Sequence, residues 1–144
     1  MGADASRLAL LKSLLPAELA ERLLPHARLM TVRRGQILLS FGDDSTDVFV
    51  VLEGRLRVEL HPLSGREVIL AEVGPGAVVG EIAALDEQPR SATVVAISDG
   101  LLARFPGPFF RDLILADPNM ACWMGKRLVS RIRVLTEKIF ELNA

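Results

Sequence analysis

The first 24 residues carry hydrophobic positions at helical intervals. In residues 5–24, ASRLALLKSLLPAELAERLL, the leucines recur every three or four positions, which is the spacing of one face of an α-helix. Pro16 divides the run, and proline is favoured in the first turn of a helix because that turn needs no backbone N–H partner. The pattern therefore predicts two short helices that pack as a lid on the next part of the chain.

From about residue 31 to residue 105 the chain changes to short β-branched runs separated by glycine, which is typical of antiparallel strands. The runs VFVVLEG and RLRVEL flank Gly54 and predict a hairpin there. A second turn, HPLSGR, precedes EVILAEV, which ends at Gly74-Pro75-Gly76, and a further strand is predicted in SATVVAI. The expected fold is mainly β with flanking helices: an antiparallel β-roll or small jelly-roll-like barrel.

Two helices are predicted after the strands. The first begins near Pro108, in PFFRDLILADP, and ends at the Asp117-Pro118 step, because the residue before a proline disfavours the α conformation. The second runs to the end of the chain. We expect residues 1–117 to form one domain and residues 118–144 to extend it as a long helix.

The terminal helix has a hydrophobic seam whose members are 4, 3, 4 and 3 residues apart, as in a coiled coil: Leu128, Ile132, Leu135, Ile139 and Leu142. We expect this seam to be a homodimer interface. A helix over residues 118–143 would be about 39 Å long, more than a small roll can cover. The alternative is a helix that lies only on its own roll, which would normally show a wider apolar face.

Composition excludes several classes of protein. The chain has 144 residues, 24% of them charged, and a net charge of −1, which indicates one globular domain with no general affinity for nucleic acid. Cys122 is the only cysteine, as expected for a protein of the reducing cytoplasm. No apolar run is long enough to span a membrane, so we expect no membrane partner.

The chain offers little for catalysis or metal binding. His26 and His61 are the only histidines, there is no tyrosine, and no serine, cysteine and histidine arrangement suggests nucleophilic catalysis. We therefore expect no enzyme activity, no metal site and no haem or redox centre.

The segment GEIAALDEQPRSAT places two opposite charges in an apolar setting. Gly80 and Glu81 begin a predicted short helical turn, whose first N–H groups attract an anion. Arg90 can return to the same place with a planar fork for phosphate oxygens, and Ser91 adds a hydroxyl. Because Glu81 would repel a bare phosphate, a sugar phosphate with hydroxyl donors fits better. The alternative is a Glu81–Arg90 ion pair that only fixes the loop.

A resemblance to the cyclic nucleotide-binding domains covers nearly the whole chain, from about Leu8. Their phosphate-binding cassette is similar to VVGEIAALDEQPRSATVVA, with matches at Gly80, Glu81, Ala83, Leu85, Arg90, Ser91 and Ala92. Upstream, GDDSTDVFVVLEG resembles the turn and strand that precede the cassette. The terminal helix resembles the dimerisation helix of Crp/Fnr-type bacterial transcription regulators.

The resemblance implies a role for each matching residue. Glu81 would accept a hydrogen bond from the ribose 2′-hydroxyl, and Arg90 would pair with the cyclic phosphate. Gly80 would let the backbone approach closely. The backbone amides of Glu81, Ile82 and Ser91, next to Ala92, would complete the cradle.

In Crp-type proteins a polar pair on the long helix contacts the purine, and the corresponding residues here are Leu135 and Thr136. Thr136 can bond to a base edge, whereas Leu135 has no hydroxyl and departs from the pattern. Arg131, one turn earlier, is expected either to reach Glu81 or to be a solvent-exposed flank residue. The resemblance favours cAMP as an allosteric ligand and implies no other cofactor.

The resemblance also implies an output. Ligand binding would rearrange a dimer in the regulatory part of a Crp/Fnr-type transcription regulator that lacks its helix-turn-helix domain, so DNA would be a partner only through that missing domain. The alternatives are a free-standing cyclic nucleotide-binding module of a channel, kinase or other signalling protein, and a dimeric scaffold with a vestigial pocket.

Overall fold

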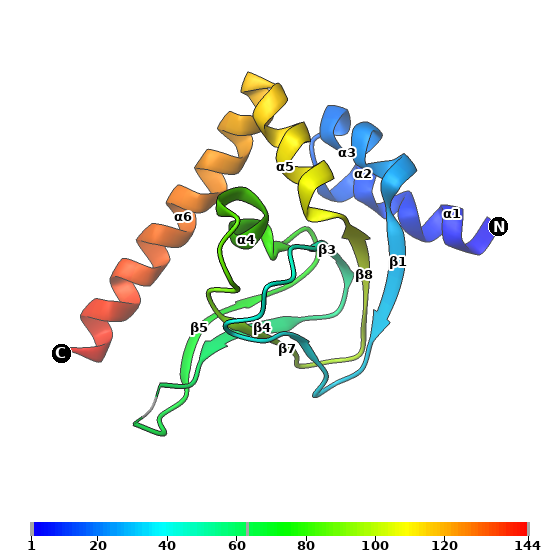
Figure 1. Cartoon of the computed structure of the whole chain (residues 1–144). Helices are drawn as coiled ribbons and strands as arrows, with labels where there is room; N and C mark the ends of the chain where they lie inside the picture. Colours follow the sequence, from blue (N-terminus) through cyan, green and yellow to red (C-terminus); the bar gives the residue numbers. More distant parts are fainter. Residues whose placement is uncertain (1, 63, 144) are drawn as a thin grey trace.

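The computed structural model describes residues 2–62 and 64–143, and it begins with short helices (Figure 1). The sequence predicts two of them, whereas the structure has three and a 3-10 turn, because the first run is divided at Ala9. Pro16 immediately precedes the third, close to its predicted place. The elements are α1 (Gly2–Leu8), α2 (Leu10–Leu14), α3 (Ala17–Leu23) and η1 (Leu24–His26).

Within the described ranges the strands form two four-stranded antiparallel sheets, which confirms the predicted jelly-roll-like β-roll. One sheet has the order β1-β8-β3-β6 and the other β2-β7-β4-β5. The strands are β1 (Arg28–Val32), β2 (Ile37–Leu39), β3 (Val48–Glu53), β4 (Leu56–Leu60), β5 (Val68–Val73), β6 (Val78–Val79), β7 (Thr93–Ala96) and β8 (Gly100–Phe105).

The predicted hairpin across Gly54 is wrong. β3 pairs with β6 and β8, whereas β4 pairs with β5 and β7, so the chain changes sheets at this glycine. Gly54 has φ +93°, and a Cβ there would lie 2.7 Å from the carbonyl oxygen of Asp99. A tight corner of this kind resembles a hairpin turn in sequence, because both require glycine. The second predicted turn, in contrast, does join two paired strands, because β4 and β5 are antiparallel neighbours.

Two hydrophobic clusters hold the layers together. One lies between the two sheets and includes Val32, Phe49 and Leu102. The other lies between the outer face of the β1-β8-β3-β6 sheet and the helices, and it includes Leu19, Phe105 and Phe110. Neighbouring residues of a strand belong alternately to the two clusters, because successive side chains point to opposite faces and both faces of this sheet are covered.

The two predicted C-terminal helices are present as α5 (Gly107–Ala116) and α6 (Pro118–Leu142). The side chain of Asp117 caps α6 by accepting a hydrogen bond from the Asn119 amide. Met120 and Met124 of α6 are buried in the core, with Leu128 packed against it. Beyond them α6 runs along the outside of the roll and away from the N-terminus (Figure 1). In the described part of the chain, every helix is too short or too polar to cross a bilayer.

Candidate functional site

The centre of the candidate site is the short helix α4 (Glu81–Asp86), which the sequence predicts at this place. Gly80 precedes it with φ +86°, a left-handed conformation that favours glycine. A Cβ at Gly80 would lie 2.6 Å from the carbonyl oxygen of Asp47 and 2.9 Å from Nη1 of Arg90. The glycine therefore lets the β6–α4 connection lie directly on the residues that hold Arg90.

Arg90 is only 3% exposed and is held by the loop between β2 and β3. Its Nε donates to Ser45 Oγ (3.1 Å), Nη1 to the Gly80 carbonyl (3.0 Å) and Nη2 to the Asp47 carbonyl (2.8 Å). Its backbone also bonds to the loop, at Gly42 and Asp43. These three side-chain bonds use three of the five guanidinium N–H donors, so two are left to bind a ligand.

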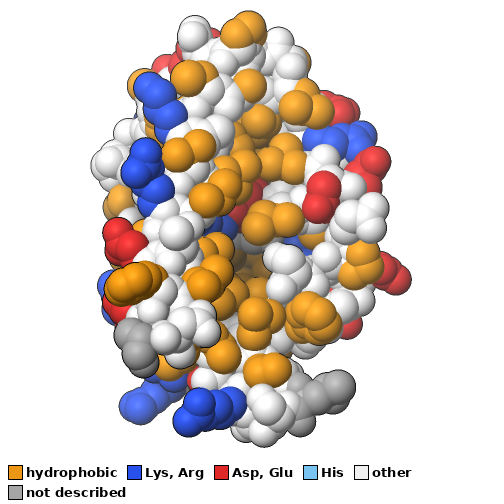
Figure 2. Space-filling view, turned by 90° about the vertical axis from the view of Figure 1, so that its left-hand side faces the viewer, with side chains coloured by type: hydrophobic (Ala, Val, Ile, Leu, Met, Phe, Trp, Pro, Cys, Tyr) orange, Lys and Arg blue, Asp and Glu red, His pale blue; other side chains and the backbone are white. Residues whose placement is uncertain are grey.

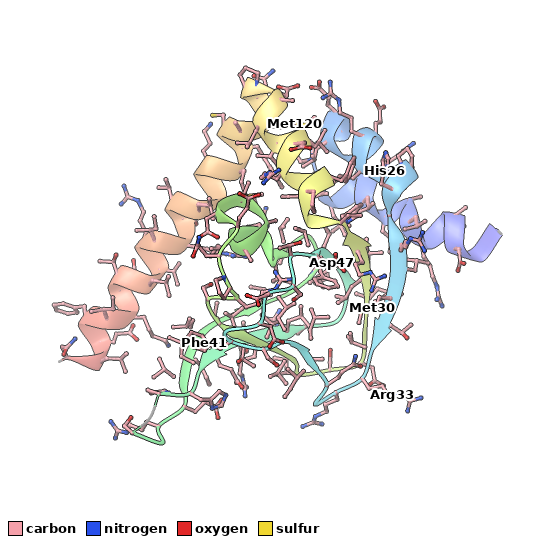
Figure 3. The ribbon with its side chains drawn as sticks, viewed as in Figure 1. His26, Met30, Arg33, Phe41, Asp47 and Met120 are labelled. Carbon is pink, nitrogen blue, oxygen red and sulfur yellow. The ribbon has the colours of Figure 1, made fainter. Side chains whose placement is uncertain are left out.

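The charge on Arg90 is offset by neighbouring acids. Burial lowers the pKa of its guanidinium from the ordinary value, and the negative charges of Asp47, Glu81 and Asp43 oppose that effect. Asp47 immediately precedes β3 and lies between α4 and β1 in the view of Figure 3. Arg90 is thus buried and held in one orientation with two N–H donors unused, which is the arrangement that anion binding by an arginine requires.

Glu81 is 2% exposed, and its carboxylate makes an ion pair with Arg131 of α6 through Oε1. The contact between Arg131 and Glu81 that the sequence suggests is thus present. The other oxygen, Oε2, is buried and has no hydrogen-bond partner among the described residues. Burial raises the pKa of Glu81 above 4.5, and the positive charges of Arg131, Arg127 and Arg90 oppose the rise. A buried acceptor without a donor needs an explanation, and a ligand hydroxyl would supply one.

Two arginines one helical turn apart attach α6 to the strand that leads into α4. Arg131 Nη2 donates to the Val78 carbonyl, and Arg127 Nη2 donates to the Gly76 carbonyl (3.0 Å). Burial and the charge of Arg131 lower the pKa of Arg127. The guanidinium of Arg127 also lies over the ring of Trp123, 5.1 Å from its centroid. The position of α6 is therefore connected to the β6–α4 segment by side-chain bonds.

A cavity of about 60 Å³ brings most of the predicted site residues together. Of the predicted ligand contacts, the following line it: Gly80, Glu81, Ile82, Arg90, Ser91, Ala92 and Arg131. Thr136 is not among the described residues that line it; its hydroxyl donates to the Ile132 carbonyl (2.8 Å) and its side chain is exposed. Its predicted contact with a purine stays a prediction.

The structure does not support the alternative of a Glu81–Arg90 ion pair. Within the described chain Arg90 bonds to Ser45, Gly80 and Asp47, and Glu81 bonds to Arg131. Both side chains nevertheless line the same cavity, as a ligand that bridges them would require.

Sequence reasoning missed several residues of the site. Ser45 and Asp47 position Arg90, although GDDSTD indicates them only as part of a resemblance. Two apolar wall residues come from strands distant in sequence, and only the apolar pattern of those strands could have indicated them: Leu39 and Val58. Val79 and Val94 also line the cavity, but they lie within the cassette sequence itself. Pairing partners so far apart in the chain are set by the sheet topology.

The predicted seam on α6 divides into two parts. Leu128 packs against the chain's own core and Leu135 is half-buried. Ile132, Ile139 and Leu142 are more than 60% exposed. Figure 2 shows the face of the molecule that carries α6, with a band of hydrophobic side chains down its middle and Lys and Arg side chains mostly toward its edges. An apolar face of this kind favours a partner but does not identify it.

The chain has relatives among known protein families and curated proteins. Residues 29–117 match the cyclic nucleotide-binding domain family. Lysophospholipase nte1 of Aspergillus terreus is 36% identical over 107 residues, which are 74% of this chain but 7% of that protein. The chain thus spans a small part of such relatives.

Two solved structures have a similar fold. The catabolite activator protein of Thermus thermophilus superposes with a TM-score of 0.75 at 29% identity, over 93% of this chain and 62% of that one. The regulatory domain of Toxoplasma gondii PKA, crystallised with cAMP, has a TM-score of 0.61 at 26% identity, over 74% of this chain and 41% of that one.

The family match covers the roll, the buried arginine and the acidic helix start, and the structural likeness extends to the long helix. The chain therefore belongs to the cyclic nucleotide-binding domain family and is of the Crp/Fnr type.

Proposed function

We propose that the chain binds a cyclic nucleotide, cAMP in the first place, as an allosteric ligand in the cavity between Arg90 and Glu81. One observation carries the proposal: the buried oxygen Oε2 of Glu81 lacks a donor among the described residues, and Glu81 lines the same cavity as a buried arginine with unused donors. A cyclic nucleotide offers a ribose hydroxyl to the first and an anionic phosphate to the second. The T. gondii relative crystallised with cAMP supports this choice of nucleotide.

The cradle fits a singly charged phosphate next to a sugar. Arg90 is held by three bonds, so little side-chain entropy remains to be lost when it binds the phosphate. Glu81 keeps Arg131 on one oxygen and receives the ribose hydroxyl on the other. The remaining predicted ligand contacts of the cassette, Gly80, Ile82, Ser91 and Ala92, also line the cavity.

The cavity must widen to accept this ligand. Its volume of about 60 Å³ is far below the ~300–1,000 Å³ of typical small-molecule pockets. Arg131 is the lining residue that comes from α6, and its side chain is 33% exposed, so it can move more readily than the strands. Ligand entry therefore displaces Arg131 or the helix that carries it. The ligand shifts the position of α6 by as much as its affinity differs between the two arrangements.

We further propose that α6 transmits this change to a homodimer, through the exposed seam residues Ile132, Ile139 and Leu142, in a regulatory protein of the cytoplasm. The likeness to the catabolite activator protein over 93% of this chain supports the regulatory part of a Crp/Fnr-type transcription regulator, which would contact DNA through a further domain. The regulatory module itself would have no catalytic role and would hold no metal.

The lysophospholipase relatives favour a second candidate. Their 36% identity over 74% of this chain corresponds to only 7% of a large protein, so a domain of this type also occurs as a small part of an enzyme. In that setting the same cavity would regulate an activity that resides elsewhere in the protein. Ligand binding is common to both candidates, and dimerisation through α6 favours the first.

A thermal-shift titration tests the binding. The native chain is heated with cAMP, cGMP and cyclic dinucleotides, next to Arg90→Ala and the exposed control Arg33→Ala. At about 100 times its Kd, a ligand adds ~2.7 kcal/mol to the unfolding free energy, or ~5 to 10 °C in Tm. We expect this shift with cAMP for the native chain and Arg33→Ala only. An unchanged Tm with every nucleotide would favour the vestigial scaffold.

Fluorescence tests the coupling to α6. Trp123 is the only tryptophan and the chain has no tyrosine, so intrinsic emission reports on α6 where Arg127 lies over the indole ring. We expect saturating cAMP to change this emission in the native chain, with the change reduced in Arg127→Gln. If cAMP raises the Tm but leaves the emission unchanged, α6 does not respond to the ligand.

A further inference from the structure

Two arginines face each other at one end of the roll, away from the cavity between Arg90 and Glu81. Arg28 of β1 and Arg104 of β8 are directly opposite in the antiparallel ladder. Residues opposite each other in a ladder project to the same face, and like charges there are destabilising. The next pair on that face is Met30 and Leu102, which pack in the core between the sheets. The two guanidinium groups therefore stand at the end of the roll's inner layer.

A hollow of about 320 Å³ lies beside this pair. Its volume is at the lower end of the range for small-molecule sites. In the view of Figure 3, Asp47 is labelled below His26 and above Met30. Pro106, the residue before α5, also lines the hollow, so the positive end of that helix dipole lies beside it. The lining residues are Pro25, His26, Ala27, Arg28, Asp47, Arg104 and Pro106.

The acids nearby leave this positive charge only partly balanced. Asp47 is the one carboxylate among the described lining residues, and its Oδ2 is 3.6 Å from Nε of Arg104, too far for a hydrogen bond. Asp4 lines an adjoining hollow with both arginines, but among the described ion pairs none joins it to either. Arg28 thus stands opposite a like charge without a paired acid in the described part of the chain.

We propose that this hollow is a second ligand site and that it binds a phosphate-type anion between Arg28 and Arg104. Guanidinium groups bind phosphate oxygens through paired N–H donors, and two of them on one face can hold two edges of one anion. A dianion neutralises the opposed pair and so removes the repulsion between the two arginines. Arg104 then bridges the anion and Asp47.

Asp47 connects this site to the first cavity. Its carboxylate lies beside Arg104, and its backbone carbonyl accepts the 2.8 Å hydrogen bond from Nη2 of Arg90. An anion that shares Arg104 with Asp47 weakens the attraction between those two side chains, and so acts on the residue whose carbonyl orients Arg90. An effect on cAMP affinity rests on the proposed function, whereas anion binding itself does not, so the two can fail separately.

The test is an NMR titration of the full chain with inorganic phosphate at constant ionic strength. We expect saturable changes in backbone amides at residues 26–28, 47 and 104–105, together with a rise in Tm. In the double variant Arg28→Gln, Arg104→Gln, we expect phosphate to bind at least tenfold more weakly. The control Arg33→Gln, Arg34→Gln has the same change of charge at exposed positions beyond the other end of β1 and should bind like the native chain.

The outcomes separate the possibilities. Changes confined to residues 80–92 would show that phosphate binds only at the first cavity, and equal weakening in both double variants would show a nonspecific charge effect; either result overturns the proposal. If the double variant does not fold, Arg28→Gln alone decides, because that exposed side chain has no hydrogen bond in the described structure. Without phosphate, Arg28→Gln should unfold at the native temperature or above it, since it removes a repulsion.

Discussion

Arg131 on α6 and Glu81 at the start of α4 form an ion pair across 50 residues of sequence, and only one of the two carboxylate oxygens is used among the described residues. The pair joins the long helix to the cradle that holds Arg90. Glu81 therefore contacts α6 through Arg131 and also lines the cavity in which we propose that a ligand binds.

Replacing Arg131 should loosen this connection. In Arg131→Ala the carboxylate of Glu81 stays buried without its main positive neighbour, so we expect a loss of about 1 to 3 kcal/mol of unfolding free energy, less than for a fully buried pair because Arg131 is 33% exposed. Faster hydrogen exchange of amides in the middle of α6 should accompany it. The matched control is Arg133→Ala on the exposed side of α6. Equal effects of the two variants would remove the special role of Arg131.

The pH dependence of stability should report on Glu81. Burial raises its pKa above 4.5, so over the window between the ordinary and the raised pKa the folded chain holds a proton that the unfolded chain has released. The unfolding free energy of the native chain then falls as pH rises through this window. Glu81→Gln has no titrating carboxyl group at this position. The unfolding free energy of the variant minus that of the native chain should therefore increase with pH from about 4 and then level off.

Urea denaturation between pH 4 and pH 8 measures this difference. Glu21→Gln, which changes an exposed glutamate, is the matched control. If the unfolding free energy of Glu81→Gln minus that of the native chain instead declines as pH rises, the ion pair with Arg131 outweighs burial, which is the opposite of our expectation.

Gly80→Ala should disturb both the backbone and Arg90. Its φ of +86° disfavours alanine, and the new Cβ would lie 2.6 Å from the Asp47 carbonyl oxygen, so the backbone must move. We expect a loss of about 1 to 3 kcal/mol in unfolding free energy and weaker cAMP binding. Gly35→Ala has nearly the same φ, +89°, with nothing within 4 Å of the new Cβ, so it isolates the conformational cost. Calorimetry that gives equal losses would show that contact with Asp47 and Arg90 has no energetic importance.

The exposed half of the α6 seam should carry self-association. Ile132→Asp with Ile139→Asp places two charges at positions that are more than 60% exposed, so the folded chain should tolerate them while a dimer interface should not. Sedimentation equilibrium should show a dimer for the native chain and a monomer for the variant. Leu115→Asp, at an equally exposed leucine of α5, should leave the dimer intact. A native chain that sediments as a monomer would end the dimer proposal.

The sequence by itself determined the features that depend on neighbours in the chain. Helical spacing indicated α6, the Asp117-Pro118 step indicated the end of α5, and the glycine-bounded β-branched runs indicated a roll. The order Gly80, Glu81 and Arg90 predicted a phosphate cradle; the structure places the three residues around one cavity, and phosphate binding there stays a prediction. The backbone freedom of glycine, the charge of glutamate and the N–H donors of arginine are properties of the residues themselves and can be read without the fold.

Only the tertiary structure decided which distant segments meet. The turn at Gly54 has a hairpin's composition, yet its strands lie in different sheets, because pairing is set by burial on both faces of each strand and not by the turn alone. Packing against the core removed Leu128 from the seam and left Ile132 exposed. Sheet topology likewise brought Ser45 and Asp47 to Arg90, and the register of β1 with β8 opposed Arg28 to Arg104. Contacts over such separations depend on the whole packed chain, so no local pattern specifies them.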